Sequence, residues 1–334
     1  MRTRLTEAFR IQHPIICAPM ALVTGGRLAA AVSNAGGLGI VGGGYAGIHG
    51  GEPDLMEELA HVKGCKFGIG FITWALERAP HVLDDVLARS PDNVFLSFGD
   101  PRPFAERIRR SGAQLICQVQ ALRHVNQAIE AGAVAIVAQG TEAGGHGAWR
   151  STLPFVPEVA DYLRRHAPDT LLLAAGGIAD GRGLAAALML GADGVVVGTR
   201  FWASAEALTP EAALKRLGTT TGDDTVRTKA IDALRGLAWP DEFGFRVVQN
   251  KLTRQWAHRE EEALAAFGSL AAAYVTARAE QNFDIVAAVA GECIGLIKDR
   301  ITAARIVDDM VREAEHVLGC GATLDFTNRT KGTS

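Results

Sequence analysis

The sequence predicts an α/β protein built as a (β/α)₈ (TIM) barrel, with a helical insertion before the final barrel helix. Strand-like apolar runs alternate eight times with helical patterns, at the spacing of βα units. The runs LLLAA (171–175) and GVVVG (194–198) are apolar without alternation, which is typical of parallel strands covered on both faces. Eight consecutive units favour a closed barrel, because an open doubly wound sheet usually has fewer strands.

The expected strands and helices follow one another in a regular order. The strands are 15–20, 38–43, 66–72, 93–99, 114–120, 134–140, 171–176 and 194–199. The helices that follow the first six strands are 26–35, 54–62, 76–88, 103–110, 122–131 and 154–165. A short helix is expected between the last two strands.

Residues 205–282 break this rhythm. EALTPEAALKRL (206–217) and REEEALAAFGSLAAAYVTARAE (259–280) have helical patterns, and a polar connector with WPDEFGFRVVQNK lies between them. We interpret this segment as a helical insertion that caps the barrel mouth. Residues 283–319 again have a helical pattern and should contain the final barrel helix. The barrel domain is therefore expected to comprise 1–204 and 283–320.

Composition limits the class of protein. The chain has 334 residues, of which 48% are hydrophobic and 21% charged, and it contains 38 glycines, as expected of a globular α/β enzyme. A net charge of −3 gives no basic footprint for nucleic acid. Five scattered cysteines without a C-x-x-C motif indicate reduced thiols in a cytoplasmic protein. No apolar run is long enough for a membrane span, and no acidic or cysteine pattern predicts a metal site.

Glycines follow the last two expected strands. Gly176, Gly177 and Gly198 lie at the carboxyl ends of those strands, where small residues let backbone N–H groups approach a phosphate. In (β/α)₈ barrels the loops after strands seven and eight are the usual phosphate site. The sequence therefore predicts a phosphorylated cofactor. Glycines 36–37 and 42–44 do not match the dinucleotide G-x-G-x-x-G pattern, so a Rossmann site is not expected.

The segment AQGTEAGGHGAWRS (138–151) follows the sixth strand and holds His146 among glycines. A histidine on a glycine loop at the catalytic face can serve as a general base, since its free pKa lies near working pH. The structural alternative is a loop histidine that binds a backbone carbonyl. The neighbouring phosphate site favours the catalytic interpretation.

The ends of two other strands carry candidate ligand contacts. Pro19 cannot donate to a sheet ladder, so Ala18, Pro19 and Met20 should leave the sheet and could run along a flat ring. Met20 could equally be a core residue. Gln118 should face the barrel interior and reach cofactor heteroatoms, although a protein hydrogen-bond network is the alternative. Gln120 lies on the same side, nearer the mouth.

With these residues in view, the chain resembles the nitronate monooxygenase (2-nitropropane dioxygenase-like) family of FMN-dependent barrels. The matching segments are HPIICAPM (13–20), AAAVSNAGGLGIVGGGY (29–45), QGTEAGGHG (139–147), AAGGIADGRGLAAALMLGADGVVVGTRF (174–201) and CIGLIKD (293–299). The resemblance implies that His146 is the catalytic residue and that FMN is the cofactor. The cofactor contacts it implies are Ala18, Pro19, Met20, Gly70, Gln118, Gly144, Gly145, Ala175, Gly176, Gly177, Gly198 and Thr199.

One position departs from the family pattern. Gly70, in FGIGF, stands where relatives often carry an asparagine that contacts the flavin. Glycine offers only backbone atoms there. The pattern GFITW (70–74) could mark a subgroup with its own substrate.

The resemblance implies oxidation of a nitronate or nitroalkane by dioxygen, giving a carbonyl compound and nitrite. His146 would stabilise the anion when protonated, or abstract the α-proton of a neutral nitroalkane when not. FMN-dependent enoyl-acyl carrier protein reductases share EAGGH, AAGGIADG and GTRF, so they and NAD(P)H:quinone reductases are alternatives, as is a non-catalytic flavin protein. The lack of a nicotinamide motif favours the monooxygenase. A homodimer through 263–275 is a further expectation.

Overall fold

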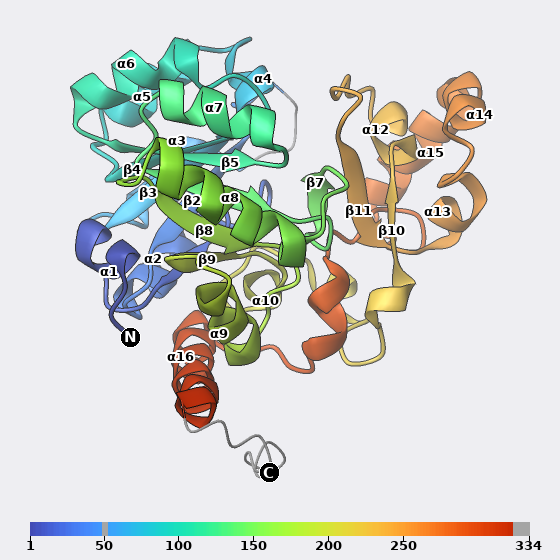
Figure 1. Ribbon diagram of the computed structural model, residues 1–334. Coiled ribbons are helices and arrows are strands. Elements are labelled where there is room, and N and C mark those ends of the chain that lie inside the picture. Colours follow the sequence, from blue (N-terminus) through green and yellow to red (C-terminus); the bar gives the residue numbers. More distant parts are fainter. Residues whose placement is uncertain (49–52, 323–334) are drawn as a thin grey trace.

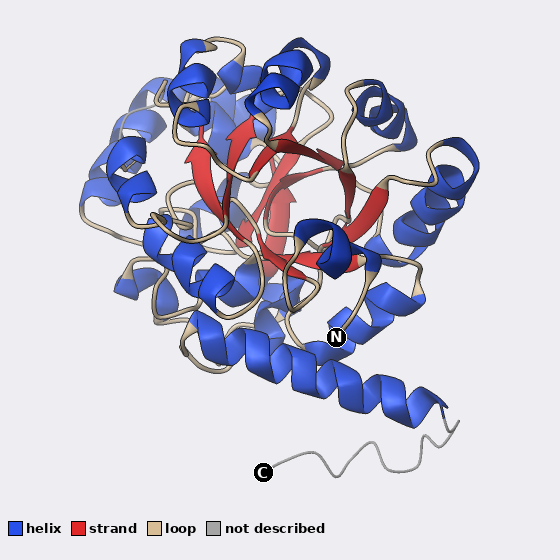
Figure 2. Cartoon of the chain, turned by 90° about the vertical axis from the view of Figure 1, so that its left-hand side faces the viewer, coloured by secondary structure: helices blue, strands red, loops and turns tan. Residues whose placement is uncertain are grey.

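The structure, a computed structural model, describes residues 1–48 and 53–322. Its centre is a closed ring of parallel strands enclosed by helices (Figure 1, Figure 2). In ring order the strands are β1 (Ile15–Cys17), β9 (Gly194–Val197), β8 (Leu171–Ala175), β6 (Ala135–Gln139), β5 (Gln114–Val119), β4 (Asn93–Ser97), β3 (Phe67–Ile72) and β2 (Gly39–Gly44). A parallel bridge between Ile16 and Leu38 joins the two ends of the ring. All the strands predicted from the apolar runs are confirmed.

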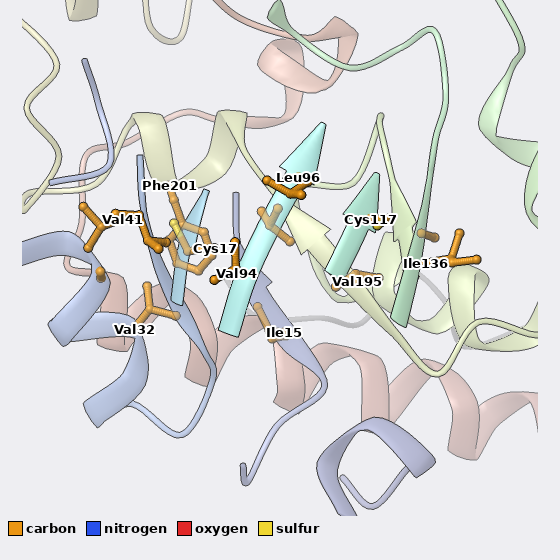
Figure 3. Close-up of a cluster of buried hydrophobic side chains, with 14 of the residues drawn as sticks. Ile15, Cys17, Val32, Val41, Val94, Leu96, Cys117, Ile136, Val195 and Phe201 are labelled. Atoms are coloured by element: carbon orange, nitrogen blue, oxygen red, sulfur yellow. The ribbon is translucent and has the colours of Figure 1, made fainter. Parts of the chain in front are cut away.

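Side-chain alternation explains why these strands read as continuous apolar runs. Ile15 and Cys17 point outward and pack with Val32 of a surrounding helix (Figure 3). Ile16, between them, joins Phe95 in a second cluster inside the barrel. Successive residues of a strand face opposite sides, so both sets must be apolar when both faces are buried.

Helices cover the outside of the barrel. They are α1 (Arg4–Phe9), α2 (Gly26–Asn34), α3 (Leu55–Ala60), α4 (Thr73–Leu76), α5 (His81–Leu87), α6 (Arg102–Ser111), α7 (Leu122–Glu130), α8 (Thr152–His166), α9 (Gly181–Met189), α10 (Thr199–Trp202) and α16 (Ala303–Ala322). The helix predicted over 76–88 is instead divided at Pro80, which lacks a backbone N–H and stands at the N-cap of α5. Within the described ranges, no helix has the length and apolarity that crossing a bilayer requires.

The helical prediction for 283–319 is correct only for its second half, α16. Residues 283–302 contain a single 3-10 turn, η2 (Glu292–Leu296). The backbone N–H of Glu292 donates to the Glu142 carbonyl at 2.9 Å, and that of Gly291 donates to Thr199 Oγ1 at 2.9 Å. These contacts with distant loops replace the hydrogen bonds of a helix.

Much of the segment 205–282 lies beside the barrel (Figure 1), and we call this segment the lobe. Its elements are α11 (Glu211–Leu214), η1 (Gly222–Asp224), β10 (Thr225–Thr228), α12 (Ala230–Leu234), β11 (Gly244–Val248), α13 (Lys251–Trp256), α14 (Glu260–Ala265) and α15 (Phe267–Ala279). The connector that the sequence analysis treated as polar therefore holds two strands. β11 pairs with β10 on one side and with β7 (Gly145–Gly147), from the loop after β6, on the other. This small antiparallel sheet joins the lobe to the barrel.

Candidate active site

A cavity of about 290 Å³ lies where the carboxyl ends of the barrel strands meet the lobe. All the residues that the family resemblance implies as catalytic or cofactor-binding line it. These residues are Ala18, Pro19, Met20, Gly70, Gln118, Gly144, Gly145, His146, Ala175, Gly176, Gly177, Gly198 and Thr199. Segments far apart in the chain are thus brought to one place, although the role of each residue stays a prediction.

The direction of the side chains on β5 determines which glutamine amide reaches the cavity. Ile116 belongs to the inner cluster, so Gln118, two residues later on β5, also faces inward and lines the cavity. Gln120 lies outside this cavity and donates through Nε2 to Gln139 Oε1 at 2.9 Å. Gln139 in turn donates to the backbone carbonyl of His146 at 3.1 Å. Gln120 therefore belongs to a protein network, and Gln118 is the amide available to a ligand.

One end of the cavity is built from glycine backbone. Gly176 and Gly177 have φ values of 102° and 75°, which favour glycine. A Cβ on Gly176 would lie 2.9 Å from the Gly140 carbonyl oxygen, whereas one on Gly198 would meet nothing nearer than Met20 Sδ at 3.6 Å. Thr199 Oγ1 accepts from Gly291 and can still donate its own proton. The cradle fits a phosphate held mainly by backbone N–H groups.

The segment Ala18–Met20 crosses the barrel end, and its position explains why residue 70 is a glycine. Thr24 fixes the segment, because its Oγ1 donates to the Ala18 carbonyl at 2.8 Å and accepts from the Met20 N–H at 3.2 Å. A Cβ on Gly70 would lie 2.3 Å from Pro19 Cβ and 2.4 Å from Pro19 Cγ. The ring of Pro19 therefore occupies the space that a side chain at position 70 would need.

His146 stands on β7, paired with Phe245 of β11, rather than in a free loop. Its ring is stacked between Trp239, at a centroid distance of 3.4 Å, and Phe245, at 4.4 Å. Its Nε2 lies 2.8 Å from Oδ2 of Asp232, and the two side chains are 7% and 5% exposed. The ring thus binds a carboxylate, not the backbone carbonyl of the structural alternative.

The electrostatic surroundings of His146 favour its neutral form. Burial lowers the pKa of the imidazole, and the positive charges of Arg235 and Arg227 lower it further, while Asp232 opposes this shift. The net effect is a pKa below the usual value of 6.5. The ring is therefore mostly uncharged near pH 7.

A buried arginine holds the loop that carries His146. The guanidinium of Arg227, on β10, donates to five backbone carbonyl oxygens. The acceptors are Thr141 at 2.8 Å, Ala143 at 3.1 Å, Gly145 at 3.4 Å, Gly147 at 2.9 Å and Gly244 at 2.5 Å. Burial lowers the pKa of Arg227 to about 10. Arg227 of the lobe thus holds both β7, which carries His146, and β11, which pairs with it.

Sequence reasoning missed the contribution of the lobe to the site. Asp232, Arg235, Trp239 and Phe245 all come from the segment between the predicted helices. Three aromatic residues within 239–245 were the available signal, whereas Asp232 had none. Among the residues that the structure describes, no three His, Cys, Asp or Glu side chains gather as a metal site would require.

A closed βα barrel with its cavity at the carboxyl ends of the strands defines a (β/α)₈-barrel enzyme. A family model described as nitronate monooxygenase matches residues 2–66 and 75–313, and the chain belongs to this family. The unmatched stretch, 67–74, contains Gly70.

Individual relatives and solved structures are similar over most of both chains. A nitronate monooxygenase of Neurospora crassa is 33% identical over 340 aligned residues, covering 90% of this chain and 89% of that protein. The structure of FabK from Thermotoga maritima is similar with a TM-score of 0.83 at 28% identity, covering 97% of this chain and 99% of that one. A nitroalkane oxidase from Streptomyces ansochromogenes is similar with a TM-score of 0.74 at 25% identity, covering 95% and 99%.

Proposed function

We propose that this chain is an FMN-dependent nitronate monooxygenase, which oxidises alkyl nitronates with dioxygen to a carbonyl compound and nitrite. The observation that carries the proposal is the meeting of His146 with the glycines after β8 and β9 in one cavity. Membership of the nitronate monooxygenase family supports the same reaction.

The chain has the groups to hold FMN. Gly176, Gly177, Gly198 and Thr199 would bind the phosphate. Ala18, Pro19, Met20, Gln118 and Ala175 would lie along the ring system, with Gly144 and Gly145 nearby and only backbone offered by Gly70. When bound, the flavin supplies the redox chemistry, and the protein supplies orientation and exclusion of competing reactions.

His146 would act as a base. The lowered pKa leaves the ring uncharged near pH 7, so it can take the α-proton of a nitroalkane and generate the nitronate in place. The alternative, an imidazolium that stabilises an added nitronate, is disfavoured because burial opposes the charge.

The test is a titration of the flavin-loaded protein under argon. Propyl nitronate should bleach the flavin absorbance, and admission of air should restore it with release of nitrite. The similarity to FabK makes an NAD(P)H-dependent reductase the second candidate. Rapid bleaching by NADPH with no response to the nitronate would overturn the proposal, as would protein that binds no FMN.

Two further properties stay predictions. A homodimer could use residues 263–275, where Val275 of α15 is 68% exposed. Sedimentation of the wild-type chain and of Val275→Glu tests this, with a shift to monomer expected for the variant. The scattered cysteines continue to predict a cytoplasmic location.

A further inference from the structure

Asp232 is a buried acid that the proposed reaction does not yet use. It is buried and lies on α12, whose Ile231 and Leu234 belong to an apolar cluster of the lobe. Its Oδ2 lies 2.8 Å from His146 Nε2, and its Oδ1 has no hydrogen-bond partner in the described structure. A buried carboxylate is costly unless it is paired, so its position beside a single partner requires an explanation.

We propose that Asp232 is a positioning residue that fixes the tautomer of His146, keeping the proton on Nε2 and the lone pair of Nδ1 toward the cavity. The catalytic part of this inference rests on the proposed function of His146. The part that concerns the ring itself does not.

Hydrogen-bond chemistry determines the tautomer. An ionised carboxylate only accepts hydrogen bonds, so Nε2 must carry the proton in this pair. In the neutral ring Nδ1 then carries the lone pair. Among the described residues, nothing donates to or accepts from Nδ1, while His146 lines the cavity.

Stacking and hydrogen bonding constrain the His146 ring in different ways. Trp239 and Phe245 lie nearly parallel to the imidazole, at 7° and 15°, and hold its plane. A half-turn about the Cβ–Cγ bond would keep the ring in that plane, but it would put Cε1 in the place of Nε2 and Cδ2 in the place of Nδ1. The bond to Asp232 selects one of the two orientations, which makes the carboxylate rather than the aromatic pair responsible for the basic nitrogen.

The charges around His146 determine how its pKa would change if the Asp232 carboxylate were removed. Burial lowers the pKa of His146, as do Arg235, at the C-cap of α12, and Arg227 on β10, whereas Asp232 raises it. Burial raises the pKa of the Tyr45 and Tyr274 phenols, and the negative charge of Asp232 raises it further. Both phenols therefore stay neutral near pH 7. Without the carboxylate, the pKa of His146 should fall further.

The experiment uses nitrogen-15 NMR of the histidine rings in the FMN-loaded protein, with the His146 signals assigned by their loss in His146→Gln. The wild type should show a protonated Nε2 and an unprotonated Nδ1. Asp232→Asn should lose this single tautomer and titrate at lower pH. Its kcat with nitroalkane should fall by about 10²-fold or more, with a smaller change in KM. The acid limb of its pH–rate profile should move to lower pH.

The controls separate positioning from folding. Asp193→Asn removes a partly buried carboxylate that accepts from the Leu172 N–H at 2.9 Å, outside the cavity, and should leave the His146 signals unchanged. Asp232→Glu retains a carboxylate and should keep more of the wild-type tautomer than Asp232→Asn.

Several outcomes would overturn the inference. A wild-type ring protonated on Nδ1 contradicts it directly, even if Asp232→Asn fails to fold. An unchanged tautomer and pH profile in a folded Asp232→Asn would do the same. Since the NMR readout needs no substrate, a chain that binds FMN but ignores nitronates would refute the proposed function and leave the positioning role standing.

Discussion

His146 is the residue on which turnover should depend most. His146→Ala should keep bound FMN, because the predicted cofactor contacts come from other residues that line the cavity. Turnover of nitroalkane should fall by about 10²–10⁴-fold, the usual contribution of general acid–base catalysis. Flavin absorbance and nitrite release measure the two effects, and His81→Ala, on the exposed start of α5, is the control. Unchanged turnover would remove His146 from the mechanism.

The same residue should make stability depend on pH. Its pKa is lowered in the folded chain, so between the folded value and about 6.5 the unfolded chain binds a proton that the native chain does not. The free energy of unfolding should therefore decrease as pH falls through this window, and this contribution is fully present only above it. Urea unfolding at several pH values should show a weaker decrease for His146→Gln than for wild type. If the free energy of unfolding depended on pH equally in both proteins, His146 would not be the group responsible.

At the scale of elements, the barrel was predictable and the lobe was not. The runs around Ile15–Cys17 and Leu171–Ala175 are apolar on both faces, and this signal is local. β11 could not be recognised in the same way, because it pairs with the four-residue β10 on one side and, on the other, with β7, three residues of a glycine loop about a hundred positions earlier. Asp232 lies on a five-residue helix without a pattern of its own, so only tertiary structure brings it to His146.

Strand β10 stabilises the loop that carries His146 through one side chain, Arg227. Arg227→Met would leave five backbone carbonyls without their shared donor, those of Thr141, Ala143, Gly145, Gly147 and Gly244. Each buried carbonyl that is left without a donor should cost about 1–3 kcal/mol of unfolding free energy. FMN affinity should also fall, since Gly144 and Gly145 lie in the loosened loop. Denaturant unfolding and FMN titration measure these effects.

The matched control for this prediction is Arg109→Met. The Arg109 side chain is 74% exposed and pairs with Glu106 one helical turn away, so its loss should change stability little. Equal stability of the two variants would show that the Arg227 contacts do not hold the loop.

For the whole molecule, the cavity belongs to the barrel and the lobe together. Barrel residues such as Gly176 and lobe residues such as Trp239 line the same space. FMN bound there should stabilise the folded chain by about 2.7 kcal/mol at a hundredfold excess over Kd. Calorimetry should show a single transition whose Tm rises with FMN concentration. A separate lobe transition that ignores FMN would contradict this coupling.

The contact between Pro19 and Gly70 also constrains how relatives of this chain can diverge. The proline ring and a side chain at position 70 compete for one volume, so the two sites should covary rather than drift independently. An asparagine at position 70 should accompany a smaller or displaced residue at position 19. An alignment of homologues should show this pairing, and relatives that freely combine a proline at position 19 with an asparagine at position 70 would contradict it.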